Sequence, residues 1–388
     1  ERAIRCGSGE AAKYLGEILN SDDDLATRLR EGSVVAVVGR SSMAESDHSS
    51  IAVAALIRDE LPHATFLTAL RRGNVRGALD MGLAPGVLPG RTAIDNPSSA
   101  LDDIWGYTPS MKGLDTTGML QAAAEGKIRT LVLLGADPLS DFPDRNLAAE
   151  AIQRAETVIS LDNFLTASSA QADIILPTTA YGEQGGTTTN LEGRISRLTQ
   201  KITPPGSVRD DWMIATELAW RLGGDLNLTS KEQIWREIEQ VAPSHAGVTV
   251  ERIMSEEARE GILVQESSVE YIFPSVQEPP IADGYGLRLI SGRKLWDAST
   301  TTSMSPSLRP LAEAPVLKVH PTDLQHLGIL SGSDVRVIST RSTENLKAVA
   351  DESLERGTAL LPFNQPGFGA NRFIDATAAV TDIRIETL

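Results

Sequence analysis

The feature that most constrains the fold is an alternation of continuous apolar runs and helical patterns across residues 1–205. The run at 33–38 is almost entirely Val and Ala, as expected for a strand buried on both faces of a parallel sheet. A helical pattern follows at 49–61, and further apolar runs come at 130–134 and 158–161. This order predicts a doubly wound, mostly parallel α/β sheet.

The rest of the chain predicts two further parts. Residues 206–285 contain two helical patterns, at 208–222 and 230–241, whose apolar stripes are typical of core packing, and a linker at 264–284. From 286 to 388 the pattern changes to short strands separated by turns. We expect this last part to be a compact β-barrel domain.

Charge and composition exclude several classes of function. The net charge of −16 argues against a nucleic-acid partner, because phosphates require a surface rich in Lys and Arg. No stretch approaches the roughly 18 apolar residues of a membrane span, so we expect no direct membrane insertion. Cys6 is the single cysteine and the five histidines are scattered. We therefore expect no metal site and no iron–sulfur cluster built by this chain alone.

Candidate binding residues follow the predicted strands. In an open parallel sheet, ligands bind beyond the carboxyl ends of the strands. Gly135 would let a backbone approach a phosphate, and Asp162 could accept hydrogen bonds from a ribose or a guanine. The loops in question are 39–42, 135–138, 162–163 and 177–190. Any α/β domain also needs Gly, Asp and Pro at strand exits in order to turn, so a purely structural role stays open.

Common catalytic and nucleotide-binding motifs are missing. The sequence has no Gly-x-Gly-x-x-Gly after a strand, no phosphate-binding P-loop and no serine nucleophile elbow. We assign no catalytic residues. The pair Glu183 and Arg194 stands out, and a salt bridge that stabilises a long loop explains it as well as a catalytic role does.

The segment 172–194 carries a family resemblance. It joins an apolar strand ending at Pro177 to Glu183, to a Gly-Gly-Thr run at 185–187, and to Asn190 with a following Glu-Gly-Arg. This combination resembles the signature of molybdopterin oxidoreductases. The resemblance implies a molybdopterin-type α/β domain and a C-terminal double-psi β-barrel, with any molybdopterin guanine dinucleotide held between them.

Positions for such a dinucleotide follow from the resemblance alone. They would be active contacts in a molybdenum enzyme and vestigial in a relative that has lost the cofactor. The matching residues are Gly135, Asp137, Asp162, Thr166, Glu183, Gly186, Thr188, Asn190, Arg194 and Asn371.

Other stretches depart from a working molybdenum enzyme. Thr-Ala-Ser stands at 166–168, where family enzymes often carry Thr-Glu-Thr or Thr-Glu-Ser, and no Cys is placed to ligate molybdenum. The stretches 74–90, 114–138 and 290–306 instead look like the G subunits of bacterial NADH:quinone oxidoreductase, complex I. That likeness implies a cofactor-free structural region of an iron–sulfur subunit, with the clusters in an N-terminal portion that we expect this chain, starting at Glu1, to lack.

The same likeness implies partners and a location. The partners would be other subunits of the peripheral arm of a proton-pumping oxidoreductase, a translocase that transfers electrons from NADH to quinone. The complex would hold the chain at the cytoplasmic face of the inner membrane. Two alternatives stay open: the dinucleotide-gripping C-terminal half of a formate dehydrogenase-like molybdoenzyme, and an unrelated α/β binding module.

Overall fold

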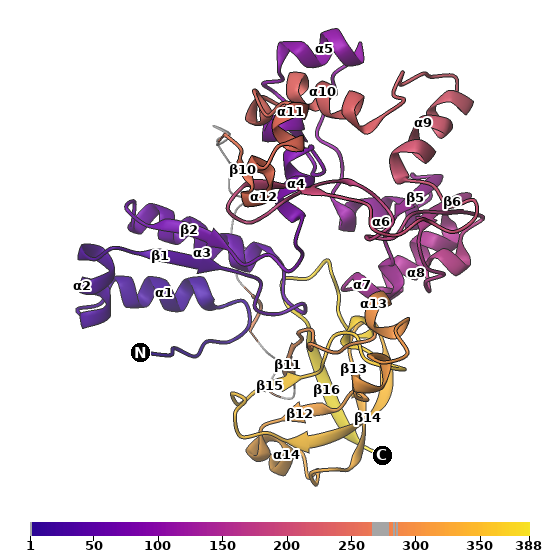
Figure 1. Cartoon of the computed structure of the whole chain (residues 1–388). Coiled ribbons are helices and arrows are strands. Elements are labelled where there is room, and N and C mark those ends of the chain that lie inside the picture. Colours follow the sequence, from indigo (N-terminus) through magenta and orange to yellow (C-terminus); the bar gives the residue numbers. More distant parts are fainter. Residues whose placement is uncertain (1, 266–278, 282–283, 285) are drawn as a thin grey trace.

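The computed structural model describes residues 2–265, 279–281, 284 and 286–388. Most of the predicted linker at 264–284 therefore lies outside the described residues. Figure 1 shows the β1–β2 unit on one side, a group of helices at the top, the β5–β6–β7 sheet opposite, and the C-terminal barrel below. The prediction of an α/β region followed by a barrel is confirmed.

The parallel strands form two sheets instead of the single sheet that we predicted. One contains β1 (Val35–Val38) and β2 (Thr65–Thr68), and the other contains β5 (Thr130–Leu134), β6 (Thr157–Asp162) and β7 (Ile174–Pro177) in that order. Between β2 and β5 the chain leaves the sheet and builds helices and the short β3–β4 pair. Because β1 and β2 hydrogen-bond only to each other, the expected continuous sheet is divided.

The helices of the α/β region begin after strand exits or polar caps. Asp115 and Asp144 each accept a hydrogen bond from a backbone N–H in the first turn of the helix that follows, as N-caps do. The elements, besides those given above, are α1 (Ala11–Leu19), α2 (Asp24–Glu31), α3 (His48–Glu60), α4 (Val75–Asp80), β3 (Val87–Leu88), β4 (Thr92–Ala93), α5 (Ser99–Trp105), α6 (Thr116–Ala124), α7 (Pro138–Asp141) and α8 (Arg145–Arg154).

The three-stranded sheet is covered on one face. α6 and α8 pack against Leu131 and Leu133 of β5, in a core that includes Val158 of β6. The opposite face carries Val132 and Leu134, which are 57% and 56% exposed, next to exposed Ile174 in β7. The β1–β2 sheet likewise exposes Val35 and Val37. Parallel sheets are normally covered on both faces, so these apolar surfaces are unusual.

An antiparallel sheet and four helices follow. The sheet has the order β10 (Ile262–Leu263), β9 (Arg194–Leu198), β8 (Gly186–Thr189), so it crosses the predicted boundary at residue 205. Its core joins Ile195 to Val248 and Ile253. The helices are α9 (Asp211–Arg221), α10 (Lys231–Val241), α11 (Val250–Met254) and α12 (Glu257–Glu260).

The apolar stripe predicted for α9 does not form a core. Ile214 is its buried residue, whereas Trp220 is 66% exposed and Leu222, just beyond the helix, is 86% exposed. The reason is the position of α9 at the margin of the molecule, where only one side of the helix meets the rest of the chain (Figure 1).

The C-terminal domain is a closed barrel of six strands in the order β11-β15-β12-β14-β13-β16. Two neighbouring pairs are parallel and the other four are antiparallel. Phe363 and Phe373 are fully buried in its core. The elements are β11 (Leu287–Ile290), α13 (Thr300–Ser303), β12 (Leu317–Val319), α14 (Pro321–His326), β13 (Asp334–Ile338), β14 (Thr343–Ala350), β15 (Thr358–Leu360) and β16 (Asp382–Thr387). In the described residues, no helix has the length and apolarity needed to cross a membrane.

The stretch 74–91 is tied to neighbouring segments by polar contacts. The Asn74 side chain accepts a hydrogen bond from the Thr189 N–H of β8 at 2.8 Å. Asp80, which has no exposed surface, pairs with Arg91 at 2.7 Å. Burial raises the pKa of Asp80, and the Arg91 charge opposes that rise. We call the stretch 74–91 the brace.

The brace also contacts the short helix η3 (Pro243–His245). Gly90 has a φ of +81°, and a Cβ placed there would lie 2.6 Å from Cδ of Pro243. His245 is buried against the ring of Trp235, and its Nδ1 is 2.9 Å from the Ser244 hydroxyl. Burial, with a smaller contribution from the Arg91 charge, lowers the pKa of His245 to about 4.

Gly90→Ala should destabilise the protein more than Gly126→Ala does. Both glycines have positive φ, but a Cβ at Gly126 meets nothing within 4 Å. We expect roughly 2–4 kcal/mol for Gly90→Ala, from strain plus steric overlap, and about 1 kcal/mol for Gly126→Ala. Thermal unfolding of both variants measures the difference, and equal shifts in Tm would contradict the close contact with Pro243.

Acidification should destabilise the fold through His245. Because its pKa is lower in the folded state, His245 contributes full stability above pH 6.5, and this contribution is lost as pH falls from 6.5 to about 4. The loss approaches about 1.4 kcal/mol per pH unit. Denaturation curves between pH 7 and 5 should show a smaller pH dependence for His245→Gln. His63→Gln, at an exposed position, is the control and should keep the pH dependence of the original protein.

Candidate functional site

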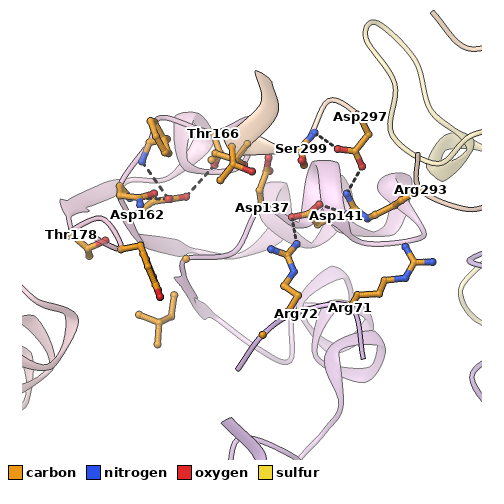
Figure 2. Close-up of a pocket in the computed structure, with 18 of the residues that line it drawn as sticks. Arg71, Arg72, Asp137, Asp141, Asp162, Thr166, Thr178, Arg293, Asp297 and Ser299 are labelled. Atoms are coloured by element: carbon orange, nitrogen blue, oxygen red, sulfur yellow. Dashed lines mark hydrogen bonds and ion pairs between the residues drawn. The ribbon is translucent and has the colours of Figure 1, made fainter. Parts of the chain in front are cut away.

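A large crevice lies at the carboxyl ends of the β5–β6–β7 strands, between this sheet and the barrel domain. Its volume is about 900 Å³, within the range of small-molecule sites. Figure 1 shows α7 and α13 where the two domains meet, and Figure 2 shows the crevice itself. Gly135, Asp137, Asp162 and Thr166 line it, so four of the sequence-predicted residues come together here.

Strand exits position the first two of these residues. Gly135 follows β5 with a φ of +56°, and the chain then turns through Asp137 into α7. Asp137 is buried, and its Oδ1 accepts hydrogen bonds from the backbone N–H and the hydroxyl of Ser168, at 3.0 and 2.5 Å. The Ser168 hydroxyl in turn accepts the Leu139 N–H. Asp137 therefore joins two loops of the sheet edge.

Asp162 ends β6 and is also buried. Its Oδ1 accepts the Asn163 N–H at 2.8 Å, while Oδ2 has a longer contact, 3.4 Å, with the Thr166 hydroxyl. The Thr166 hydroxyl donates to Ser169 at 2.9 Å. Oδ2 is thus the carboxylate oxygen with capacity for a further donor in the crevice.

The other predicted residues lie elsewhere. Asn371 is buried beside the crevice, where its amide donates to the Leu139 and Ser140 carbonyl oxygens. Gly186 and Thr188 belong to β8, and Asn190 closes the turn after it, accepting the Glu192 and Arg194 N–H groups. These positions shape the loop and the β8–β9 hairpin and do not line the crevice.

The expected pairing of Glu183 with Arg194 does not form. Arg194 pairs with Glu192 at 3.2 Å and donates to the Gly261 carbonyl oxygen, while Glu183 accepts the Ala180 N–H at 2.9 Å. The physical reason is local geometry, because each side chain finds a partner within its own turn or across β9.

The sequence analysis missed the charged residues that dominate the crevice. Arg293, from the segment after β11, donates to Asp297 at 2.9 Å and to Asp141 of α7. Arg72, from the loop after β2, approaches Asp141 at 3.7 Å. Figure 2 shows Arg72 and Arg293 converging on this acidic pair. The Arg293 guanidinium also lies 5.1 Å from the ring centre of Phe363 in the barrel core.

A second charged contact continues the seam between the domains. Arg341 of the barrel pairs with Asp144, at 2.8 Å, and with Asp375, at 2.9 Å. Asp144 has no exposed surface, and burial raises its pKa against the opposing effects of the Leu147 N–H and the Arg341 charge. Since Asp144 also caps α8, one carboxylate links a helix start to the barrel.

Asp211 adds another carboxyl group to the crevice wall. Burial raises its pKa, and the nearby charge of Asp210 adds to that rise. The Thr178 hydroxyl donates to it. Within the described residues, no three His, Cys, Asp or Glu side chains gather as a metal site.

Two domain families match the chain. The model described as "Molybdopterin oxidoreductase" matches residues 64–221. The model described as "Molydopterin dinucleotide binding domain" matches residues 287–384, which is nearly the whole barrel. The two matches meet across the crevice.

Curated relatives come from several oxidoreductases. "NADPH-Fe(3+) oxidoreductase subunit alpha" of Geobacter sulfurreducens is 28% identical over 81% of this chain and 36% of its own length. "F420-dependent formate dehydrogenase subunit alpha" of Methanocaldococcus jannaschii is 28% identical, over 81% and 50%. The NADH-quinone oxidoreductase G 2 subunit of Rhizobium meliloti is 29% identical, over 76% and 34%. The chain thus spans a third to a half of the length of these relatives.

One solved structure, acetylene hydratase from Pelobacter acetylenicus, matches the fold with a TM-score of 0.53. The match covers 89% of this chain and 55% of that one, at 17% identity. It supports the arrangement of the α/β region and the barrel.

Arg293→Ala should weaken the contact between the domains, because it leaves Asp141 and the buried Asp297 without their shared cation. We expect a loss of roughly 2–4 kcal/mol in the free energy of unfolding. The neighbouring Lys294 pairs with the exposed Glu313, so Lys294→Ala is the matched control and should cost less than about 1 kcal/mol. Calorimetry of both variants tests this, and equal effects would contradict the structural role of Arg293.

Proposed function

Because this chain belongs to the molybdopterin oxidoreductase family, we propose that it forms the C-terminal structural region of the G subunit of a complex I. In this role it contributes no catalytic residue and no redox centre of its own. It supports electron transfer from NADH to quinone by holding neighbouring subunits of the peripheral arm. The complex keeps it at the cytoplasmic face of the membrane.

The observation that carries the proposal is the internal pairing of the crevice charges. A dinucleotide brings two phosphates, which need cations with free capacity. Arg293 is held by Asp141 and Asp297, Arg72 approaches the same Asp141, and Lys294 is held by Glu313. Among the described crevice residues, Arg71 is the cation without a carboxylate within 4 Å. The residues present therefore fit a dinucleotide poorly, which supports a cofactor-free crevice.

The brace adds support. The stretch 74–90 is one of those that resemble G subunits, and its polar residues bind this chain itself: Asn74 the β8 backbone, and Asp80 the side chain of Arg91. Arg76 lies so close to Gly193 that a Cβ there would be 2.7 Å from its Nη2. A stretch that resembles G subunits and is devoted to internal packing is consistent with a structural role.

A specific observation favours the second candidate, a dinucleotide-binding half of a formate dehydrogenase-like enzyme. The crevice of about 900 Å³ has room for a large ligand, and the Asp162 Oδ2 lies there with spare accepting capacity. Several matched relatives are named formate dehydrogenases. In this alternative Asp162 would orient the bound group through hydrogen bonds, and the cofactor would supply the redox chemistry.

Analysis of the natively purified complex separates the two candidates. We expect molybdenum and tungsten, measured by mass spectrometry, and oxidised-pterin fluorescence to be at background relative to the amount of this chain. A pterin-containing formate dehydrogenase, purified and assayed in parallel, is the positive control. One metal and two pterins per chain would refute the cofactor-free proposal and establish the second candidate.

A further inference from the structure

The Gly-Gly-Thr run that begins the hairpin has a role that the crevice does not explain. Gly185, Gly186 and Thr187 lie away from the crevice, at the start of β8. β8 is an edge strand, because it pairs with β9 on one side and with no strand on the other in the described part of the chain. Such an edge presents backbone N–H and C=O groups that can pair with another chain.

The direction of these backbone groups follows from two hydrogen bonds. The Thr189 N–H donates to the Asn74 side chain, at 2.8 Å, so this amide points away from β9. The Asn190 N–H donates to the Arg194 carbonyl oxygen across the hairpin, at 3.0 Å. Backbone amides alternate in direction along a strand, so the Thr187 N–H points outward like that of Thr189. Thr187 is therefore the unpaired position of this edge.

An apolar cavity of about 380 Å³ adjoins the same residues. Gly185 and Gly186 form part of its lining, with Ile238 of α10 and the rings of Trp212 and Trp235. Both indole N–H groups are already bonded, Trp235 to the Val248 carbonyl oxygen at 2.6 Å and Trp212 to Asp210 at 3.2 Å. The rings therefore offer apolar surface to an occupant.

Charge and sterics further define what fits. A Cβ on Gly186 would meet nothing within 4 Å, so the approach to the edge is open. Arg197 lies opposite Thr187 across the hairpin and is exposed at the cavity, with no carboxylate within 4 Å among the described residues. An extended backbone would satisfy the edge, a bulky apolar side chain the cavity, and a carboxylate Arg197.

We propose that the β8 edge at Gly185–Thr187 and this cavity bind an extended segment of another protein subunit. The segment adds a strand beside β8 and places a bulky apolar side chain between Trp212 and Trp235. Relatives named as subunits of larger oxidoreductases make a protein partner the fitting occupant. The inference goes beyond the proposed function, since the surface is separate from the crevice and does not depend on pterin content.

Photo-crosslinking in the natively assembled complex tests the proposal. Benzoylphenylalanine is placed at Gly186 or at Met254, which lines the cavity and is 54% exposed. We expect both positions to link to the same short segment of one other subunit, and that segment to contain a bulky apolar residue. Links within this chain, to a second copy of it, or to no protein would overturn the proposal.

Two substitutions at Thr187 test the backbone pairing. Thr187→Pro removes the outward N–H and keeps the β8–β9 hydrogen bonds, which are made by the alternate residues. Thr187→Val keeps the N–H and the strand preference. We expect the proline to lower the crosslink yield by about tenfold, as loss of one or two backbone hydrogen bonds would, and the valine to leave it within about twofold. Equal yields from the two variants would overturn strand addition.

Discussion

The arrangement of the molecule depends on the way the barrel grips the chain just after β5. Arg293 reaches Asp141 at the end of α7, Arg341 reaches Asp144 at the start of α8, and Asn371 reaches the carbonyl oxygens between them. These contacts act on one short segment that also forms the exit of a parallel strand. Because Asp144 is fully buried, its charge requires the barrel cation, and neither domain can keep this arrangement without the other.

This seam explains why a crevice with the outline of a ligand site can serve as a joint. A phosphate site and an interdomain contact both need cations at strand ends. What separates them is whether carboxylates of the same chain already neutralise these cations. Here Asp141 and Asp297 stand opposite Arg293, so the attraction that would draw an anion is used to hold the domains together.

The sequence predicted the elements better than their assembly. The apolar runs located β1, β5 and β6, and the turn-separated pattern after 286 located the barrel, because strand period and turn residues are local properties. The division into two parallel sheets depends on which strands pair, and nothing local encodes that. Gly135, Asp137, Asp162 and Thr166 were predicted as site residues because they follow strands. Arg72 and Arg293 were missed because they enter the crevice from segments far away in the sequence, and a surface arginine looks the same before it folds.

The uncovered sheet faces bear on how this chain behaves in solution. Val132, Leu134 and Ile174 on one sheet, and Val35 and Val37 on the other, are apolar surfaces that water solvates poorly. Two copies that meet through these faces would bury them, so each face favours self-association. The net charge of −16 opposes that contact by repulsion between like-charged copies. Colloidal stability of the isolated chain thus rests on its carboxylates, and concentrated salt or acid would remove the repulsion while leaving the apolar attraction in place.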